Sequence, residues 1–498
     1  MSRPRPNPAR VLAVVGFGIF VAADDLTVAS TLLRQIVGDL RIPLPEGLDD
    51  AAWIVNGYLV AYVAVMPMAG RLSDVLGRRR VFIGGLVMFA IGSAVIPFTT
   101  SLGPFLTWRV VTAIGGGAMV PVALAAVTDV YPRERRGRAL GALGAIETLG
   151  WVWGPLFGAM LVRFLDWRWQ FYLNVPLAIL GIAAAWVVLR DVGDPVPSRR
   201  LDAAGAIALS SALVALTIGL LEVGDIASAA DLSGLRNGGD LPAWPFFIAA
   251  AVATVALVAV ERRSADPLIS PATLRQRNAA LALGANLLVG AVLAIAMVDI
   301  PLFVNLVVEP EIRSAAVLSG WVLTALTASM ALMSRVGGSL ADRYSHRLPS
   351  VGGMIAAAAA LGAMGVTWGV DTGAAVMAVH VGVLGAGIGL VTAPLTAAVI
   401  DEVPQERRGV GTALVVISRL VGLALGLAGL TSWALHRYNA LRSSIILPPL
   451  TDPGYVDAAE SAQASLSASV LAETFLAAAL VALAAVAVAA RLGRRAAG

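Results

Sequence analysis

An acidic side chain stands near the middle of an apolar stretch that is long enough to cross a membrane. Residues 141–159 read GALGAIETLGWVWGPLFGA, and Glu147 is the charged residue among them. Gly150 and Gly154 are four residues apart, so they form a face of small residues on which another helix can pack closely. Pro155 removes a backbone donor and favours a bend. A bendable membrane helix with a buried acid predicts a moving transport element; the alternative is a kinked packing helix whose Glu has a structural partner.

Further ionisable side chains lie in other apolar stretches. Asp24 and Asp25 are adjacent, and adjacent residues on a helix point about 100° apart, so we expect one of the two to face a cavity and the other to face partners in the second span or an outside loop. Either carboxyl group, once out of water, could carry a proton. Arg109 stays charged and needs a partner in lipid. The second half of the chain adds three such groups, of which the histidine could equally be a hydrogen-bonded structural residue: Asp299, His380 and Arg419.

The composition indicates a polytopic helical membrane protein and excludes several other classes. Hydrophobic residues make up 58% of the 498 residues, and the mean hydropathy is +0.82, far above that of soluble proteins. The chain has no cysteine, and its 36 basic residues are all arginine. It therefore lacks disulfides, thiolate metal sites and the lysine of a P-loop ATP site, so uphill transport needs an ion gradient or a separate ATPase. The sequence has no His-x-x-x-His pair and no Gly-x-Ser-x-Gly elbow, so we expect no metal, no cofactor and no enzymatic activity.

The arginines indicate a topology for fourteen apolar segments. These segments are expected at residues 11–33, 50–70, 81–99, 103–129, 138–161, 171–189, 203–222, 244–261, 279–302, 315–336, 349–368, 373–400, 409–436 and 465–490. Each is long enough to span a bilayer. With the N-terminus inside, the inside segments hold 26 arginines and the outside segments hold 8. This skew follows the positive-inside rule and places both termini in the cytoplasm. It also accounts for the pI near 9.8 without nucleic acid, because the arginines are spread over many short loops.

Two motifs occur twice in the chain. Residues 129–137 (DVYPRERRG) recur as residues 401–409 (DEVPQERRG), and residues 70–74 (GRLSD) recur as residues 338–342 (GSLAD). Segments one to six therefore match segments nine to fourteen, and segments seven and eight are an insertion. We predict a six-helix half at residues 1–190, a linker with two extra membrane helices at 191–277, and a second six-helix half at 278–498. Parallel repeats of this kind place a cavity at the midplane between the halves.

The chain resembles a known family at three places. Residues 70–80 (GRLSDVLGRRR) look like the loop signature of the major facilitator superfamily, and residues 167–176 (WRWQFYLNVP) resemble the signature of its 14-span drug:proton antiporters. The antiporter signature of its drug exporters is matched by Gly141, Gly150, Gly154, Pro155 and Gly158. Ala159 departs from the last glycine of that signature. The resemblance implies an all-α major facilitator fold in the bacterial inner membrane, with two six-helix halves and two inserted helices.

The resemblance also implies roles for single residues. Asp25 aligns better than Asp24 with the family's motif and would act in proton transfer with Arg109, beside which Thr112 and Ala113 replace the family's usual Gln and Gly. Glu147 would couple protonation to motion. An inside gate that stabilises the outward-open state would comprise Gly70, Asp74, Arg78, Asp129, Asp342 and Arg343, and the second half of the cavity would be shaped by Arg419, His380 and Asp299. Glu147 and Arg419 occupy equivalent repeat positions with opposite charge. The family fold separates spans five and thirteen, however, so we expect no direct contact between them.

The last two segments are longer than a membrane requires. Helices are expected from Gly409 to about Ser444 and from Tyr455 to Arg491, with a proline-rich break between them. Arms of about 36 residues reach ~54 Å, whereas the hydrocarbon core is ~30 Å thick. A long periplasmic hairpin is therefore predicted at about residues 436–465. The arms and residues 430–439 (LTSWALHRYN) resemble an actinobacterial branch of the family, which includes an exporter of triacylglycerol that has a periplasmic lipoprotein partner.

The predicted function is proton-coupled antiport that exports hydrophobic substrates, lipids such as triacylglycerol or lipophilic drugs, by alternating access. The expected partners are that substrate, protons, the membrane and a lipid-carrying periplasmic lipoprotein. One alternative is a general multidrug:proton antiporter without a lipid role, whose pumping of cationic dyes should vanish on Asp25→Asn. The others are a polar-solute transporter, which would need more polar groups in the spans, and a non-transporting membrane scaffold or lipid receptor.

Overall fold

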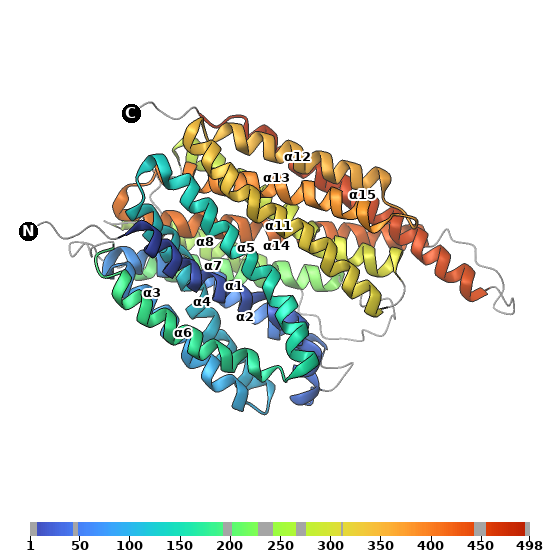
Figure 1. Ribbon diagram of the computed structural model, residues 1–498, viewed down its shortest axis with the longest axis horizontal. Coiled ribbons are helices and arrows are strands. Elements are labelled where there is room, and N and C mark those ends of the chain that lie inside the picture. The colour runs from blue at the N-terminus through green and yellow to red at the C-terminus, as the bar shows by residue number, and fades with distance from the viewer. Residues whose placement is uncertain are drawn as a thin grey trace, which may run out of the picture.

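The computed structural model describes residues 7–42, 48–192, 202–227, 243–264, 275–309, 312–442 and 455–493. Within these ranges the protein is built of long helices and contains no strand (Figure 1). The first six helices are α1 (Pro8–Asp39), α2 (Leu48–Leu76), α3 (Arg78–Val95), α4 (Leu102–Val130), α5 (Arg133–Phe164) and α6 (Arg168–Val188). Two helices follow them, α7 (Ala203–Ala227) and α8 (Trp244–Arg263). The last six are α10 (Arg277–Phe303), α11 (Ile312–Arg343), α12 (Arg347–Thr367), α13 (Ala374–Asp401), α14 (Arg408–Arg442) and α15 (Tyr455–Ala489).

Each of the fourteen predicted segments coincides with one of these helices. An apolar segment in lipid forms a helix because only internal hydrogen bonds can satisfy its backbone there. Twelve helices are long and apolar enough to cross a membrane, whereas the described parts of α7 and α11 do not meet that criterion. The predicted all-α membrane fold is confirmed. The count of fourteen spans and the cytoplasmic position of the termini stay predictions.

Helices α1–α6 and α10–α15 form two groups, each with its own core. In Figure 1 most of the blue-to-teal helices of the first group lie below the yellow-to-red helices of the second, and α5 crosses to lie against α11. The core of the first group includes Tyr58 and Phe82, and that of the second includes Phe303 and Phe475. The helix α1 begins and α15 ends at the same end of the molecule. The domain boundaries at 190 and 277 stay predictions, because residues 193–201 and 265–274 lie outside the described ranges.

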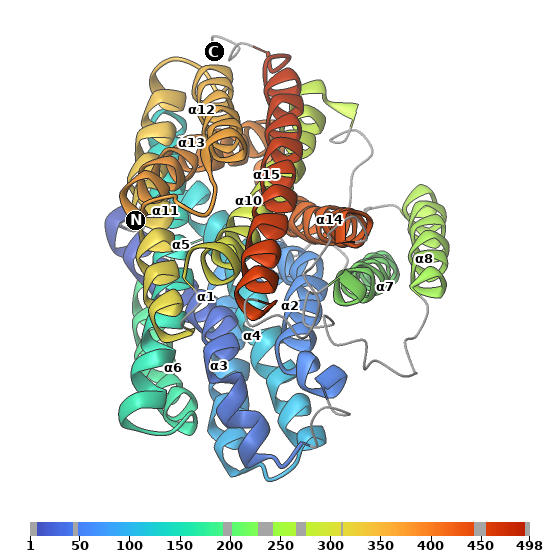
Figure 2. The same cartoon turned by 90° about the vertical axis from the view of Figure 1, so that its right-hand side faces the viewer.

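The helices α7 and α8 lie beside the two groups (Figure 2). On one side, the Ser210 hydroxyl of α7 donates a hydrogen bond to the Ala64 carbonyl of α2 at 2.6 Å. On the other side, Leu220 of α7 packs against Ala424 and Ala428 of α14. The helix α7 therefore covers a seam at which the first group meets the second.

Glycines bring α5 into close contact with α1. A Cβ atom added to Gly150 would lie 2.7 Å from the Phe20 carbonyl oxygen, and one added to Gly154 would lie 2.8 Å from that of Asp24. Gly158 faces Val28 of α1 in the same way. The predicted small-residue packing face is thus confirmed, and α5 continues as one helix through Pro155. This packing sets the position of α5, and with it Glu147, relative to the acids of α1.

The last two helices have the predicted length. Both α14 and α15 contain 35 residues, which corresponds to ~52 Å. The helix α15 projects beyond the rest of the protein at the right of Figure 1. Arg437 and Glu473 join α14 to α15 through an ion pair of 2.9 Å. The turn of the predicted hairpin, residues 443–454, lies outside the described ranges, and its periplasmic position stays a prediction.

Candidate proton-coupling and gating site

The acid of α1 and the arginine of α4 form a buried ion pair. The Arg109 guanidinium lies 2.6 Å from the Asp25 carboxylate and also donates to the Asp25 backbone carbonyl at 2.7 Å. Asn174 of α6 donates to the other Asp25 oxygen at 3.0 Å. The exposed fractions of the Asp25 and Arg109 side chains are 0% and 1%. The Arg109 guanidinium also lies 4.2 Å from the centre of the Tyr58 ring, which adds a cation–π contact. Four helices of the first group, α1, α2, α4 and α6, therefore meet at one charged pair.

The neighbouring Asp24 has different partners from those expected. The sequence favoured partners in the second span or an outside loop, whereas Gln170 of α6 donates to Asp24 at 2.8 Å. The expectation was wrong because the turn of α1 directs Asp24 toward α6. The other Asp24 carboxylate oxygen has no hydrogen-bond partner among the described residues. Asp24 is 6% exposed and, in contrast to Asp25, makes no ion pair in the described parts of the chain.

Glu147 of α5 and Arg419 of α14 form a direct ion pair, which corrects the expectation that they do not touch. One guanidinium nitrogen lies 3.1 Å and 3.0 Å from the two carboxylate oxygens. The exposed fractions of the two side chains are 8% for Arg419 and 12% for Glu147. The two helix backbones are not closely packed against each other. The separation of the helices was correctly expected, but these long side chains cross the space between them.

A small cavity lies around this ion pair between the two groups of helices. Its volume is about 20 Å³, room for about one water molecule. Apart from the ion pair, its walls are mainly apolar, with contributions from Ile19, Val120, Leu143, Thr392 and Val415. An ion pair in such surroundings is little screened, so its making and breaking can bias the arrangement of the two groups.

The repeated GRLSD and GSLAD motifs cap helices of the opposite group. Asp74 of α2 accepts hydrogen bonds from the backbone N–H groups of Gly409 and Val410 at the start of α14, at 3.0 and 3.4 Å. Asp342 of α11 accepts hydrogen bonds from the backbone N–H groups of Gly137 and Arg138, the fifth and sixth residues of α5, at 2.9 and 2.8 Å. A carboxylate at a helix N-terminus satisfies free N–H groups and the positive end of the dipole.

Glycines allow these caps to form. A Cβ atom on Gly70 would collide with the backbone of Gly409, and one on Gly338 would collide with that of Gly137. The predicted gate residues Gly70, Asp74 and Asp342 thus lie where the two groups touch. They hold this end of the structure closed.

The second repeated motif forms reciprocal ion pairs at the same end. Arg136 of the first copy lies 3.1 Å from Asp401 of the second, and Arg408 of the second lies 3.1 Å from Asp129 of the first. Arg78 also pairs with Asp129, at 3.0 Å, and forms a short ion pair with Asp74. These contacts link the predicted gate residues into one network.

The sequence did not predict every residue of this network, and one predicted gate residue lies apart from it. His346 lies 3.2 Å from Asp401; the repeat of the DVYPRERRG motif was the signal that could have identified Asp401. The predicted gate residue Arg343 is exposed and lies against the ring of its neighbour Tyr344, at 5.4 Å.

Gln170 and Asn174, which donate hydrogen bonds to the two acids of α1, were not predicted as site residues. Two amides four residues apart in an apolar helix were the available signal.

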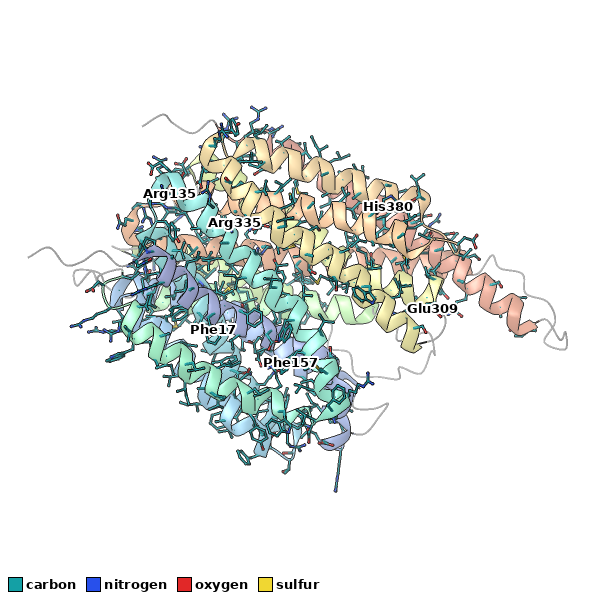
Figure 3. The ribbon with its side chains drawn as sticks, in the orientation of Figure 1. Phe17, Arg135, Phe157, Glu309, Arg335 and His380 are labelled. Carbon is teal, nitrogen blue, oxygen red and sulfur yellow. The ribbon has the colours of Figure 1, made fainter. Side chains whose placement is uncertain are left out.

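Asp299 and His380 lie away from the Glu147–Arg419 cavity. Asp299 is 8% exposed and lies within hydrogen-bonding reach of Thr474 of α15. His380 accepts a hydrogen bond from the Trp368 indole at 3.2 Å. Figure 3 shows His380 toward the same end as Glu309 and opposite Arg135. Neither lines the cavity, so a role for them there stays a prediction.

Comparison with known proteins identifies the class to which this architecture belongs. The family profile of the Major Facilitator Superfamily matches residues 15–427. Among solved structures, a double-tryptophan mutant of XylE superposes with a TM-score of 0.63 at 13% identity, covering 96% of each chain. The human organic anion transporter MFSD10 (TETRAN) gives 0.60 at 18% identity, covering 96% of this chain and 100% of that one. The chain belongs to the Major Facilitator Superfamily and is a multi-pass membrane transporter rather than an enzyme.

Curated mycobacterial proteins are similar to this chain over most of its length. A triacylglyceride transporter of Mycobacterium tuberculosis is 33% identical over 448 residues, which cover 86% of this chain and 84% of that protein. A triacylglyceride transporter of Mycobacteroides abscessus is 31% identical over 484 residues, covering 95% of this chain and 91% of that protein. The predicted family and branch are confirmed.

Proposed function

We propose that this protein exports hydrophobic molecules, triacylglycerol-like lipids or lipophilic drugs, from a bacterial inner membrane by proton-coupled antiport. The names of its mycobacterial relatives support a lipid substrate. The mainly apolar walls of the cavity suit such a substrate. At about 20 Å³ the cavity is far below the ~300 Å³ or more that a ligand site needs. Transport therefore requires the two groups of helices to move apart around it.

The observation that carries the proposal is the Glu147–Arg419 ion pair. It connects α5 to α14, one helix from each repeat, and its charges are almost fully shielded from solvent. A proton on Glu147 removes the negative charge and leaves a hydrogen bond in place of the ion pair. The attraction that holds the two groups together at the cavity then falls. Protonation of Glu147 thus frees one group of helices to move relative to the other.

The α1 acids provide a second place for the proton. Arg109 balances the charge of Asp25, whereas Asp24 has no cation of its own among the described residues. A proton arriving between these two carboxyl groups neutralises the excess negative charge. Because α1 packs on α5 through Gly150 and Gly154, a change at Asp24 or Asp25 can reach Glu147 through one helix contact. The sequence left either acid open and favoured Asp25, and the lack of a cation partner at Asp24 among the described residues supports Asp24 as well.

The closed end and the long arms suggest the direction of transport. Reciprocal caps and ion pairs join the two groups at the arginine-rich end, which the positive-inside rule assigns to the cytoplasm. This arrangement corresponds to a state that is closed toward the cytoplasm. At the other end, α14 and α15 exceed the ~30 Å core of a bilayer by about 20 Å each. They would guide a lipid across the outer leaflet toward a periplasmic lipoprotein.

Reconstitution in proteoliposomes tests the proposal. We expect a fluorescent triacylglycerol analogue to move when an inward proton gradient is applied, and we expect the same vesicles to take up protons when substrate is present. Asp25→Asn should abolish both. Ethidium transport without lipid transport would instead identify a general multidrug antiporter. If neither substrate nor protons move, the transport proposal is refuted and a membrane scaffold or lipid receptor remains.

A further inference from the structure

An apolar groove lies where α2 meets the inserted helices α7 and α8, apart from the Glu147–Arg419 cavity. Its volume is about 430 Å³. It is lined by α2, α7 and α8, mainly through Met68, Ala206, Ser211, Ala215, Ile218 and Phe246. From Ala206 to Ile218 it follows twelve residues of α7, or ~18 Å. It is thus elongated along the helix axis, a shape that suits a single hydrocarbon chain.

The groove faces the bilayer. Ile207, which also lines it, is 60% exposed, and Val252 and Val255 elsewhere on α8 are 62% and 70% exposed. Side chains of this kind are exposed in a membrane protein because lipid, not water, covers them. Any occupant of the groove therefore comes from the surrounding membrane.

Exposed arginines lie at one end of the groove. Arg262 and Arg263 form the last turn of α8 and are both exposed. A Cβ atom added to Gly205 would lie 2.8 Å from Glu261, which places this turn beside the first turn of α7 and the groove residue Ala206. Glu261 is 7% exposed and Asp202, which also lies beside Gly205, is partly buried, so the most exposed charges here are those of the two arginines.

We propose that the groove binds one acyl chain of an anionic phospholipid whose headgroup contacts Arg262 and Arg263. The apolar walls accept the chain, and the two guanidinium groups attract a phosphate. A neutral lipid would not use the charged end, so charge complementarity selects the anionic class. The helix α7 contacts both α2 and α14, so the lipid would sit beside the helices that move in transport. The site is distinct from the substrate cavity.

Lipid retention by the purified full-length protein tests this site without a transport assay. Ala215→Trp places a large ring in the groove, and Ala249→Trp is the matched control, because Ala249 of α8 is exposed and outside the groove. Native mass spectrometry should find a bound anionic phospholipid on the wild type and on Ala249→Trp, and its loss from Ala215→Trp. Equal retention by the two tryptophan variants would overturn the proposal, as would a wild type that holds only detergent or neutral lipid.

A second variant keeps the proposal testable if Ala215→Trp does not fold. Replacing both Arg262 and Arg263 by Gln changes only exposed side chains, so folding should be preserved. This variant should lose the preference for anionic over zwitterionic phospholipid that the wild type shows when both are supplied. An unchanged preference contradicts the assigned headgroup contact. Glu147→Gln should retain the lipid normally, so a failure of the transport proposal and a failure of this site give different results.

Discussion

Replacing Glu147 by Gln removes one charge from the central ion pair while keeping the shape of the side chain. The amide oxygen of the substituted side chain can still accept one hydrogen bond from Arg419, but it cannot balance the guanidinium charge. Because the Arg419 side chain is only 8% exposed, that charge gains little solvation from water. The contact that joins α5 to α14 is therefore weakened in every conformation that contains it.

The expected cost follows from the burial of the pair. Removing one partner of a buried ion pair costs about 3–5 kcal/mol, and the retained hydrogen bond places this variant near the lower value. A cost of about 3 kcal/mol changes the equilibrium between the closed and separated arrangements by roughly 100-fold. Combining Glu147→Gln with Arg419→Met removes both charges, so the double variant should cost less than the sum of its two single substitutions. We expect a coupling energy of about 2 kcal/mol between the two positions.

Two measurements check this reasoning. Substrate flux in proteoliposomes should depend on pH in the wild type, and this dependence should be reduced in Glu147→Gln, because the proton no longer has an acid to bind at that position. Unfolding in detergent gives the coupling energy from the two single variants and the double variant. Glu473→Gln is the matched control, since it breaks a half-exposed ion pair with Arg437 and should leave flux and pH dependence unchanged. An unaltered pH profile for Glu147→Gln, together with a coupling energy near zero, would refute the proposed role.

Three further predictions concern the gate, the helix packing and the outer end of α1. Asp74→Asn weakens the cap on α14 and should open the closed end, which spin labels on introduced cysteines can measure because the chain has none of its own; unchanged label distances would contradict the gate. Gly154→Leu should destabilise the protein by about 1–3 kcal/mol through collision with α1, whereas Gly362→Leu, where no atom lies within 4 Å of an added Cβ, should be neutral; equal unfolding temperatures would contradict this. The Arg168 hydrogen bond lowers the pKa of Asp39, so its contribution is present above pH ~4 and lost as the pH falls through the lowered pKa. Asp39→Asn should therefore cost about 0.5 kcal/mol near neutral pH, a value reduced by solvent screening of this exposed side chain, and unfolding at low pH should show no difference from the wild type.

The repeat made part of the site predictable before any contact was known. The spacing that relates residues 129–137 to 401–409 pairs Asp129 with Asp401, Arg136 with Arg408, and Glu147 with Arg419. The structure uses these pairs reciprocally, so that each arginine of one copy meets the acid of the other. The repeat alone did not show this exchange. It shows which positions are equivalent, but not that equivalent loops lie against each other.

The contact between Glu147 of α5 and Arg419 of α14 could not be predicted from the positions of the helices alone. Two helices that do not pack together still carry side chains that meet, because Glu and Arg are long enough to cross a small cavity. The same holds for Asp24, whose partner Gln170 lies 146 residues away. Such contacts depend on the rotation of each helix about its axis. Hydropathy does not report that rotation in a span that is apolar on nearly all sides.

The sequence by itself determined the membrane class, the helical segments, the repeat and the long final arms. These properties follow from composition and local periodicity, because a lipid environment leaves an apolar segment little choice but a helix. Only the tertiary structure decided that Glu147 binds Arg419, that Asp74 and Asp342 cap helices of the opposite repeat, and that α7 covers the seam beside α2 and α14. These features arise from distances of a few ångströms between segments far apart in the chain, which no local pattern encodes.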